Sequence, residues 1–121
     1  MSERIATFEE FWPFYVGEHR SPLGRGLHYV GSIAAPLTLV ALIASGAWLA
    51  LPAVLVAGYG PAWFAHFVVE KNRPATFTYP RWSLVADYKM LGLALRGRMA
   101  DEVTRLYGSP HPSKDAPLRA A

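Results

Sequence analysis

The sequence contains no cysteine. This absence excludes a disulfide framework, a thiolate metal site and a cysteine nucleophile. Charged residues are also scarce, at 17% of the chain, whereas an ordinary soluble domain carries about 25%. The net charge of +3 is modest, and the basic residues form no single stripe of the kind that binds nucleic acid. With 121 residues, the chain has the length of one domain.

The shortage of charge is concentrated in one segment. From Gly26 to Val69, 44 residues include no Asp, Glu, Lys or Arg. A membrane-spanning helix needs about 20 apolar residues, so this segment predicts two spans, about Leu27–Ser45 and Leu49–Val69, with the turn at Gly46. We therefore expect an all-α fold: an integral-membrane helical bundle built on a central transmembrane hairpin with flanking amphipathic helices.

The segment before the hairpin has helical signals of its own. Thr7 and Glu10 have the spacing of a capping box. Aromatic residues at helical spacing predict a helix over Thr7–Gly17, kinked or late-starting because of Pro13, with its aromatic side chains at the membrane interface. Turn-forming residues predict a loop over Ser21–Gly26.

After the hairpin, Arg81–Arg96 predicts an amphipathic helix that lies in the interface or spans partly. Its expected apolar face carries Leu84, Tyr88, Leu91 and Leu95. Asp101–Tyr107 predicts a last short helix ended by Gly108. One membrane domain is expected over residues 1–108, followed by a disordered tail over residues 109–121, which are rich in proline and charge.

The charges beside the hairpin predict its orientation. Basic residues precede and follow it, namely Arg20, Arg25, Lys71 and Arg73. The positive-inside rule places these residues, and with them both termini, on the cytoplasmic side of a multi-pass protein. No signal peptide is visible at the N-terminus, so the hairpin itself is expected to direct insertion.

Histidines mark both ends of the hairpin. His28 opens the first span, His66 nearly closes the second, and their midpoint lies beside Gly46. Because a helix rises about 1.5 Å per residue, equal arms return both imidazoles to one depth. His19 lies just across the loop, and Glu70 shares a helix face with His66. Three imidazoles and a carboxylate predict a divalent metal site, and two histidines with one carboxylate is the usual Fe(II) arrangement.

Simpler interpretations stand beside the metal site. Interfacial histidines are often only hydrogen-bonded caps, and Glu70 could pair with Lys71 or Arg73. Asp87 is a second candidate acid, although Lys89 or Arg81 could neutralise it. His111, between two prolines in the tail, is interpreted as a bystander.

The residues around the three histidines resemble a known family. They are Glu18-His19, the run Leu27–Gly31 and the run His66–Ala75. From about Phe8 to Arg98 the chain resembles the Mpo-type family of small multi-pass membrane proteins. The most specific part is His-x-x-x-Glu-Lys-x-x-Pro-Ala, which fixes five positions in ten. Ala65 departs from the glycine usual in the family, and Asn72–Phe77 is similar to a short bacterial-type branch, which implies a bacterial inner membrane.

The resemblance implies an activity. Fungal members are iron-dependent dioxygenases that α-oxidise 2-hydroxy fatty acids during phytosphingosine breakdown. For this chain it implies a fatty-acid-type lipid substrate, an Fe(II) cofactor held by His19, His28 and His66, and a product one carbon shorter. Glu70 is then a fourth ligand or an acceptor that orients an imidazole. Arg25 or Arg73 would meet the substrate carboxylate.

Two other functions stay open at this point. One is a non-catalytic membrane protein that binds lipid or a partner protein. The other is a metal-dependent lipid enzyme with a different reaction, such as a hydroxylase or a hydrolase. The sequence leaves the oligomeric state open as well.

Overall fold

The computed structural model describes residues 4–119, and within them the chain is helical without any strand. Five α-helices carry the fold, and short 3-10 or π segments connect some of them. The α-helices are α1 (Phe8–Gly17), α2 (Pro22–Ser45), α3 (Pro52–Phe64), α4 (Pro80–Leu95) and α5 (Met99–Tyr107). The shorter segments are η1 (Trp48–Ala50), the π-helical η2 (Ala65–Glu70) and η3 (Ala75–Phe77).

The predicted hairpin is present, but its first helix begins earlier than predicted. α2 starts at Pro22, so most of the expected Ser21–Gly26 loop is helical. The reason is local: the Ser21 side chain accepts a hydrogen bond from the Gly24 amide, and proline at the first helical position has a backbone angle suited to the helix. Gly46 ends α2 in the left-handed conformation at φ 73°, which confirms it as the turn residue.

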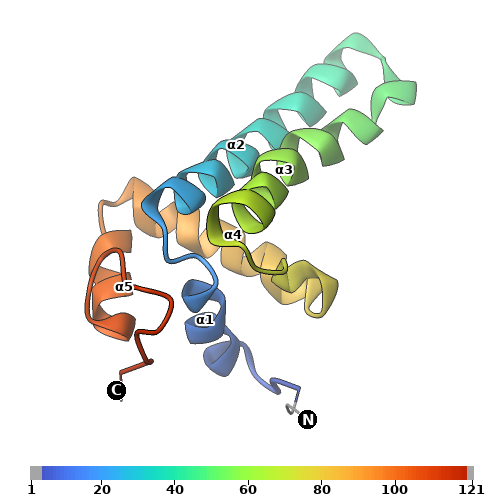
Figure 1. Cartoon of the computed structure of the whole chain (residues 1–121). Coiled ribbons are helices and arrows are strands. Elements are labelled where there is room, and N and C mark those ends of the chain that lie inside the picture. The colour runs from blue at the N-terminus through green and yellow to red at the C-terminus, as the bar shows by residue number, and fades with distance from the viewer. Residues whose placement is uncertain (1–3, 120–121) are drawn as a thin grey trace.

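The hairpin projects away from the other helices. α2 and α3 run side by side, and their joined tip is remote from α1, α4 and α5 (Figure 1). Two segments, Pro22–Ser45 and Trp48–Glu70, are long and apolar enough to cross a membrane, by length and composition. Only 11% of each apolar window is buried inside the protein. Large apolar side chains therefore face outward, including Leu37 and Val40 on α2.

The part of the molecule away from the hairpin tip, formed by α1, α4 and α5, holds the hydrophobic core, and we call it the base. Phe11, Trp12 and Tyr15 of α1 are buried there against α4 and α5. These rings therefore fill the core, and the interfacial depth expected for the aromatic residues of α1 stays a prediction. The Trp12 indole also donates to Glu102 of α5 at 2.6 Å, which satisfies its polar atom inside the core.

α4 buries a different face from the one predicted. Ser83, Ala86 and Met90 point inward, whereas Leu84 and Tyr88 of the expected apolar face are exposed. Ser83 lines the cavity beside the histidines, and Ala86 and Met90 pack in the core with the aromatic residues of α1.

Residues 109–119 fold back without forming a helix. Two of its carbonyls accept hydrogen bonds from the Arg20 guanidinium, and the Pro110 carbonyl accepts one from Arg25 at 2.8 Å. Pro112 is buried. The division into a domain over residues 1–108 and a disordered tail over 109–121 stays a prediction, and residues 120–121 lie outside the described part.

The two arms of the hairpin approach most closely at two glycines. A Cβ added to Gly31 would lie 2.3 Å from the Gly58 carbonyl oxygen, whereas one added to Gly26 would meet nothing within 4 Å. We expect Gly31→Ala to lower the stability of the fold by roughly 1–3 kcal/mol, because the backbones must separate. The measurement is thermal unfolding in detergent micelles.

Gly26→Ala is the matched control on the same helix. It should be neutral or raise the stability by up to about 1 kcal/mol, because alanine favours a helix more than glycine does. Equal melting temperatures for the two variants would contradict the close approach.

Candidate metal centre

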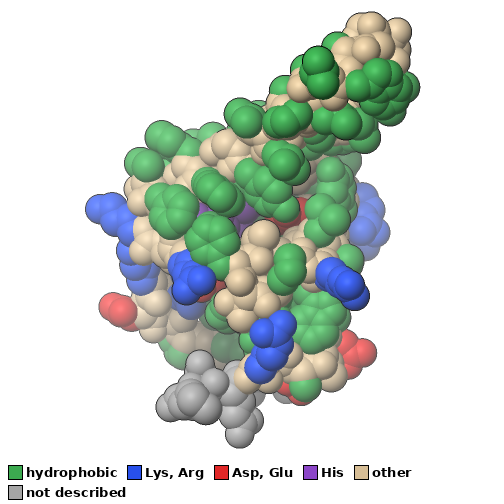
Figure 2. Space-filling view, turned by 90° about the vertical axis from the view of Figure 1, so that its right-hand side faces the viewer, with side chains coloured by type: hydrophobic (Ala, Val, Ile, Leu, Met, Phe, Trp, Pro, Cys, Tyr) green, Lys and Arg blue, Asp and Glu red, His purple; other side chains and the backbone are tan. Residues whose placement is uncertain are grey.

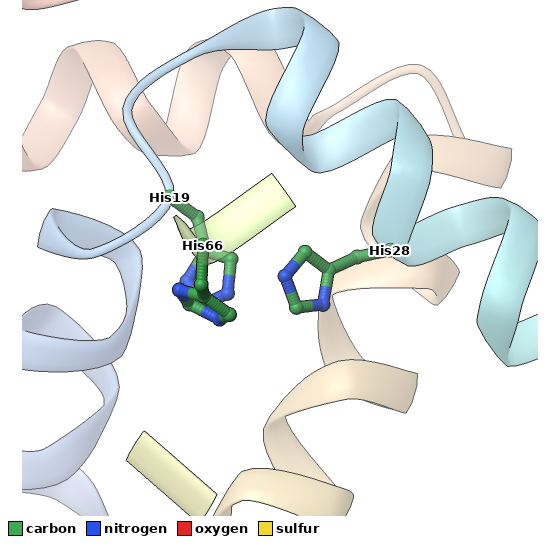
Figure 3. Close-up of side chains that lie close together, drawn as sticks. All are labelled: His19, His28 and His66. Carbon is green, nitrogen blue, oxygen red and sulfur yellow. The ribbon is translucent and has the colours of Figure 1, made fainter. Parts of the chain in front are cut away.

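The three predicted histidines lie together at the base of the hairpin. His19 comes from the link between α1 and α2, His28 from the second turn of α2, and His66 from η2, where the chain returns from the tip. One ring nitrogen of each lies within 4.8 Å of one from the other two. The ring centroids are 4.3 to 4.8 Å apart, and Figure 3 shows the imidazoles turned toward a common point.

A local change of helix type positions His66. The second arm switches from α to π over Ala65–Glu70 and ends at Lys71 in the left-handed conformation, φ 56°. A π segment is uncommon and is often found at functional sites, as is a non-glycine residue at positive φ. After this reversal the backbone amide of Asn72 donates a hydrogen bond to the His66 carbonyl at 2.8 Å, and the Asn72 side chain points back toward the His66 ring.

An oxygen faces the Nδ1 atom of every imidazole. His19 Nδ1 lies 2.6 Å from the Tyr15 carbonyl, and His66 Nδ1 lies 2.7 Å from Asn72 Oδ1. His28 Nδ1 is 3.7 Å from Asp87 Oδ1, within ion-pair range but beyond a hydrogen bond. A carbonyl or carboxylate oxygen accepts a hydrogen bond, so the arrangement favours imidazoles that carry their proton on Nδ1. The Nε2 atom then keeps the lone pair that can bind a metal ion.

Two of the three Nε2 atoms are buried without a partner. His19 Nε2 and His28 Nε2 are buried and make no hydrogen bond. Buried polar atoms are normally satisfied, so unpaired ones call for a partner such as a metal ion. Burial, reinforced by His28 and His66, lowers the pKa of His19 well below its usual value. The ring is therefore neutral at pH 7, which is the form that binds metals. The residues present fit a divalent cation held by three imidazoles.

Asp87 connects the histidines to α1. It accepts a hydrogen bond from the Tyr15 hydroxyl and faces His28. Burial, and then the Asp87 charge, raise the pKa of Tyr15 well above its usual value, so the phenol keeps its proton and donates. Within residues 4–119 no Lys or Arg forms an ion pair with Asp87. The expected neutralisation by Lys89 or Arg81 is thus not found, because Lys89 instead lies over the Trp12 ring.

A cavity of about 260 Å³ opens beside the histidines. All three histidines line it, together with Tyr15, Ser83 and Asp87 and a larger number of apolar residues from α2, α3 and α4. Figure 2 shows the histidines at the bottom of a hollow framed by hydrophobic side chains, below the projecting hairpin. The Ser83 hydroxyl is buried in this wall without a hydrogen-bond partner.

The three other candidate residues lie outside the cavity wall. Glu70 is buried, but its Oε1 atom accepts a hydrogen bond from the Ser21 amide at 2.6 Å at the start of α2. The Arg25 guanidinium donates to the backbone carbonyls of His19, Arg20 and Pro110. Arg73 lies over the Phe77 ring. These contacts indicate that Glu70 and Arg25 fix the link that carries His19, and that neither arginine faces the cavity.

Sequence reasoning missed two residues of the site. Asn72 lies inside the run that resembles the family, but no role was predicted for it. It follows His66 by six residues, and only the π segment and the reversal at Lys71 bring its side chain back to the His66 ring. The Asn72 side chain also donates to the Glu18 carbonyl, so it links η2 to the end of α1. Tyr15 is buried in the core, and its hydroxyl and carbonyl also face the site.

Fold and site together define a small all-helical protein with an exposed apolar hairpin and a buried three-histidine centre. The family described as 2-hydroxy-palmitic acid dioxygenase Mpo1-like matches residues 5–99 of the chain. The chain belongs to this family, as the sequence motifs predicted. Comparison with curated proteins and with solved structures gives no match.

The three-imidazole centre predicts metal binding that depends on each histidine. We expect anaerobically purified protein to bind one divalent metal ion, and His19→Ala, His28→Ala and His66→Ala each to abolish stoichiometric binding, because two imidazoles hold the ion poorly. Elemental analysis and titration with Co(II), followed by its visible absorption, measure this. His111→Ala is the control, because His111 is exposed and lies outside the centre. A triple-alanine variant that bound metal as well as the wild type would contradict the assignment.

Proposed function

We propose that this protein is an Fe(II)-dependent dioxygenase that shortens 2-hydroxy fatty acids by one carbon. The observation that carries the proposal is the convergence of three buried imidazoles, two of them with unpaired Nε2 atoms, on a cavity that is otherwise largely apolar. The family description supports the same substrate class. In the balanced reaction a 2-hydroxy acid and one O₂ give CO₂, water and the acid one carbon shorter, and the substrate supplies all four electrons.

The chain's own residues have distinct tasks in this proposal. His19, His28 and His66 hold the ion through Nε2, while Tyr15, Asp87 and Asn72 orient their rings from the Nδ1 side. A bound Fe(II) supplies the open coordination positions and the redox chemistry that oxygen requires. The enclosing side chains limit the access of water to the ion, which protects a reactive centre from side reactions.

The substrate head has few partners in the cavity besides the metal. Among the described residues that line it there is no Lys or Arg, so the expected contact of Arg25 or Arg73 with the carboxylate lacks support. The Ser83 hydroxyl is buried in the wall and unpaired, and it is available to donate to a carboxylate or a hydroxyl. Binding of the acid head therefore relies on the ion's charge, aided by Ser83.

We further propose that the hairpin is embedded in a membrane. Its two helices are long enough to span and mostly unburied, and a water-exposed apolar surface of this size would be costly. Arg20 and Arg25 flank the start of α2, and Lys71 and Arg73 follow the end of η2. These ends of the hairpin lie on the side of α1, α4 and α5, opposite the tip (Figure 1). The positive-inside rule then places the base and the histidines on the cytoplasmic face, and the family branch suggests a bacterial inner membrane.

Turnover tests the proposed reaction. Protein loaded anaerobically with Fe(II) and then exposed to O₂ should convert 2-hydroxyhexadecanoic acid to pentadecanoic acid and CO₂ without added 2-oxoglutarate. His66→Ala should lower the rate to background, because the ion loses a ligand, and His111→Ala should match the wild type. Mass spectrometry identifies the product.

The products also separate this proposal from the other two functions. Metal-dependent conversion without loss of a carbon would indicate a hydroxylase or a hydrolase. Stoichiometric lipid binding without bound metal or any product would indicate a non-catalytic lipid-binding protein. Either result would overturn α-oxidation.

The orientation is tested with topology reporters. Fusions at the N-terminus and after Gly108 should both report a cytoplasmic location, because two spans return the chain to its starting side. Periplasmic signals from both fusions would reverse the assignment, and opposite signals would show that an odd number of segments span.

A further inference from the structure

The cavity has two chemically different ends. The histidines, Asp87 and Ser83 gather at one end, near the base. At the other end the wall consists of Ala35 from α2 and of Val54 and Leu55 from α3. No charged side chain within the described part of the chain lines that far end. A ligand that fills the cavity must therefore be polar at one end and apolar at the other.

The far end lies along the hairpin axis. His28, Gly31 and Ala35 are spaced by three and four residues, so they form one face of α2. Gly58 packs beside both Gly31 and Ala35, which fixes the facing stretch of α3. The cavity is thus a groove that follows the hairpin from the histidines toward its tip, and we call it the hairpin groove.

The reach of the hairpin groove can be estimated from helix geometry. Ala35 follows His28 by seven residues, which is about 10 Å along a helix axis. A carbon–carbon bond of about 1.5 Å advances an extended zigzag chain by about 1.3 Å per carbon. About eight carbons of an extended acyl chain therefore span the distance from the histidines to Ala35.

The groove continues into exposed apolar surface. Leu55 at its far end is 61% exposed, and Leu84 on the α4 side is 56% exposed. The Tyr88 hydroxyl donates to the Ser32 carbonyl at 2.9 Å, which ties α4 to α2 beside the groove. In Figure 2 the rim of the hollow is formed by hydrophobic side chains on the side of the molecule. A chain longer than the groove can leave it sideways along the hairpin.

We propose that the hairpin groove binds the acyl chain of the 2-hydroxy acid and that Ala35 is its length-selecting residue. The head lies at the histidines, the first eight or so carbons follow the groove between the hairpin and α4, and the later carbons pass Ala35 to the outer surface of the hairpin. Ala35 permits this passage because its side chain is small. The inference rests on the proposed function for the head and adds the path of the tail.

Chain-length selectivity is the first test. Ala35→Trp should close the passage, so turnover of 2-hydroxyhexadecanoic acid should fall about tenfold or more relative to 2-hydroxyoctanoic acid, which ends at about position 35 and does not have to pass it. Ala35→Leu should give a smaller shift in the same direction. Leu37→Trp is the matched control, because Leu37 is exposed on α2 and does not line the groove. Retained turnover of the eight-carbon acid shows that the variant is folded, and an unchanged ratio would overturn the role of Ala35.

The second test does not depend on catalysis. A 2-hydroxy fatty acid with a diazirine near carbon eight is photolysed with metal-loaded protein in lipid nanodiscs, and the labelled peptides are identified by mass spectrometry. Label should concentrate on Ala35, Val54 and Leu55 and should fall several-fold in Ala35→Trp. Label spread evenly over the hairpin, as with a diazirine phospholipid, would overturn the groove. Groove labelling without turnover would leave the tail path standing and remove the proposed reaction.

Discussion

Three buried imidazoles must be satisfied by three separate parts of the chain, and this requirement ties the molecule together. Tyr15 supplies a carbonyl from α1, Asp87 a carboxylate from α4, and Asn72 an amide oxygen from beyond the hairpin. Each of these oxygens belongs to an element that must be in place for the site to exist. The cost of burying an unpaired polar group thus links the hairpin, α1 and α4 through one small volume.

The base and the hairpin have different tasks in this fold. The base, with Phe11 and Met90 in its core, provides a rigid support whose packing fixes the orientations of the histidines. The hairpin provides apolar surface that faces outward and a groove that leads to the same histidines. Only 11% of each apolar window of the hairpin is buried, whereas the three histidines at its base are buried.

Two buried charged residues near the histidines stabilise the backbone and do not line the cavity. Glu70 and Arg25 are both buried, yet each uses its polar atoms on the backbone of the segment around His19 to Ser21. Fixing that link fixes His19, so these residues influence the centre by position. The cavity keeps one carboxylate, Asp87, and among the described residues no Lys or Arg side chain lines it. A cation at the histidines would then be the positive charge that an acid head meets.

The sequence by itself determined the helical class, the hairpin with its turn at Gly46, the three histidines and the family, because charge spacing, turn chemistry and motif spacing are local properties. Only the tertiary structure decided the rest. The earlier start of α2 depends on the capping of Ser21, and the inward face of α4 depends on which helices it crosses. The roles of Asn72, of Asp87 and of the Tyr15 hydroxyl arise from contacts across 6 to 72 positions of sequence. Periodicity carries no information about such contacts, since they depend on how the helices pack around the buried imidazoles.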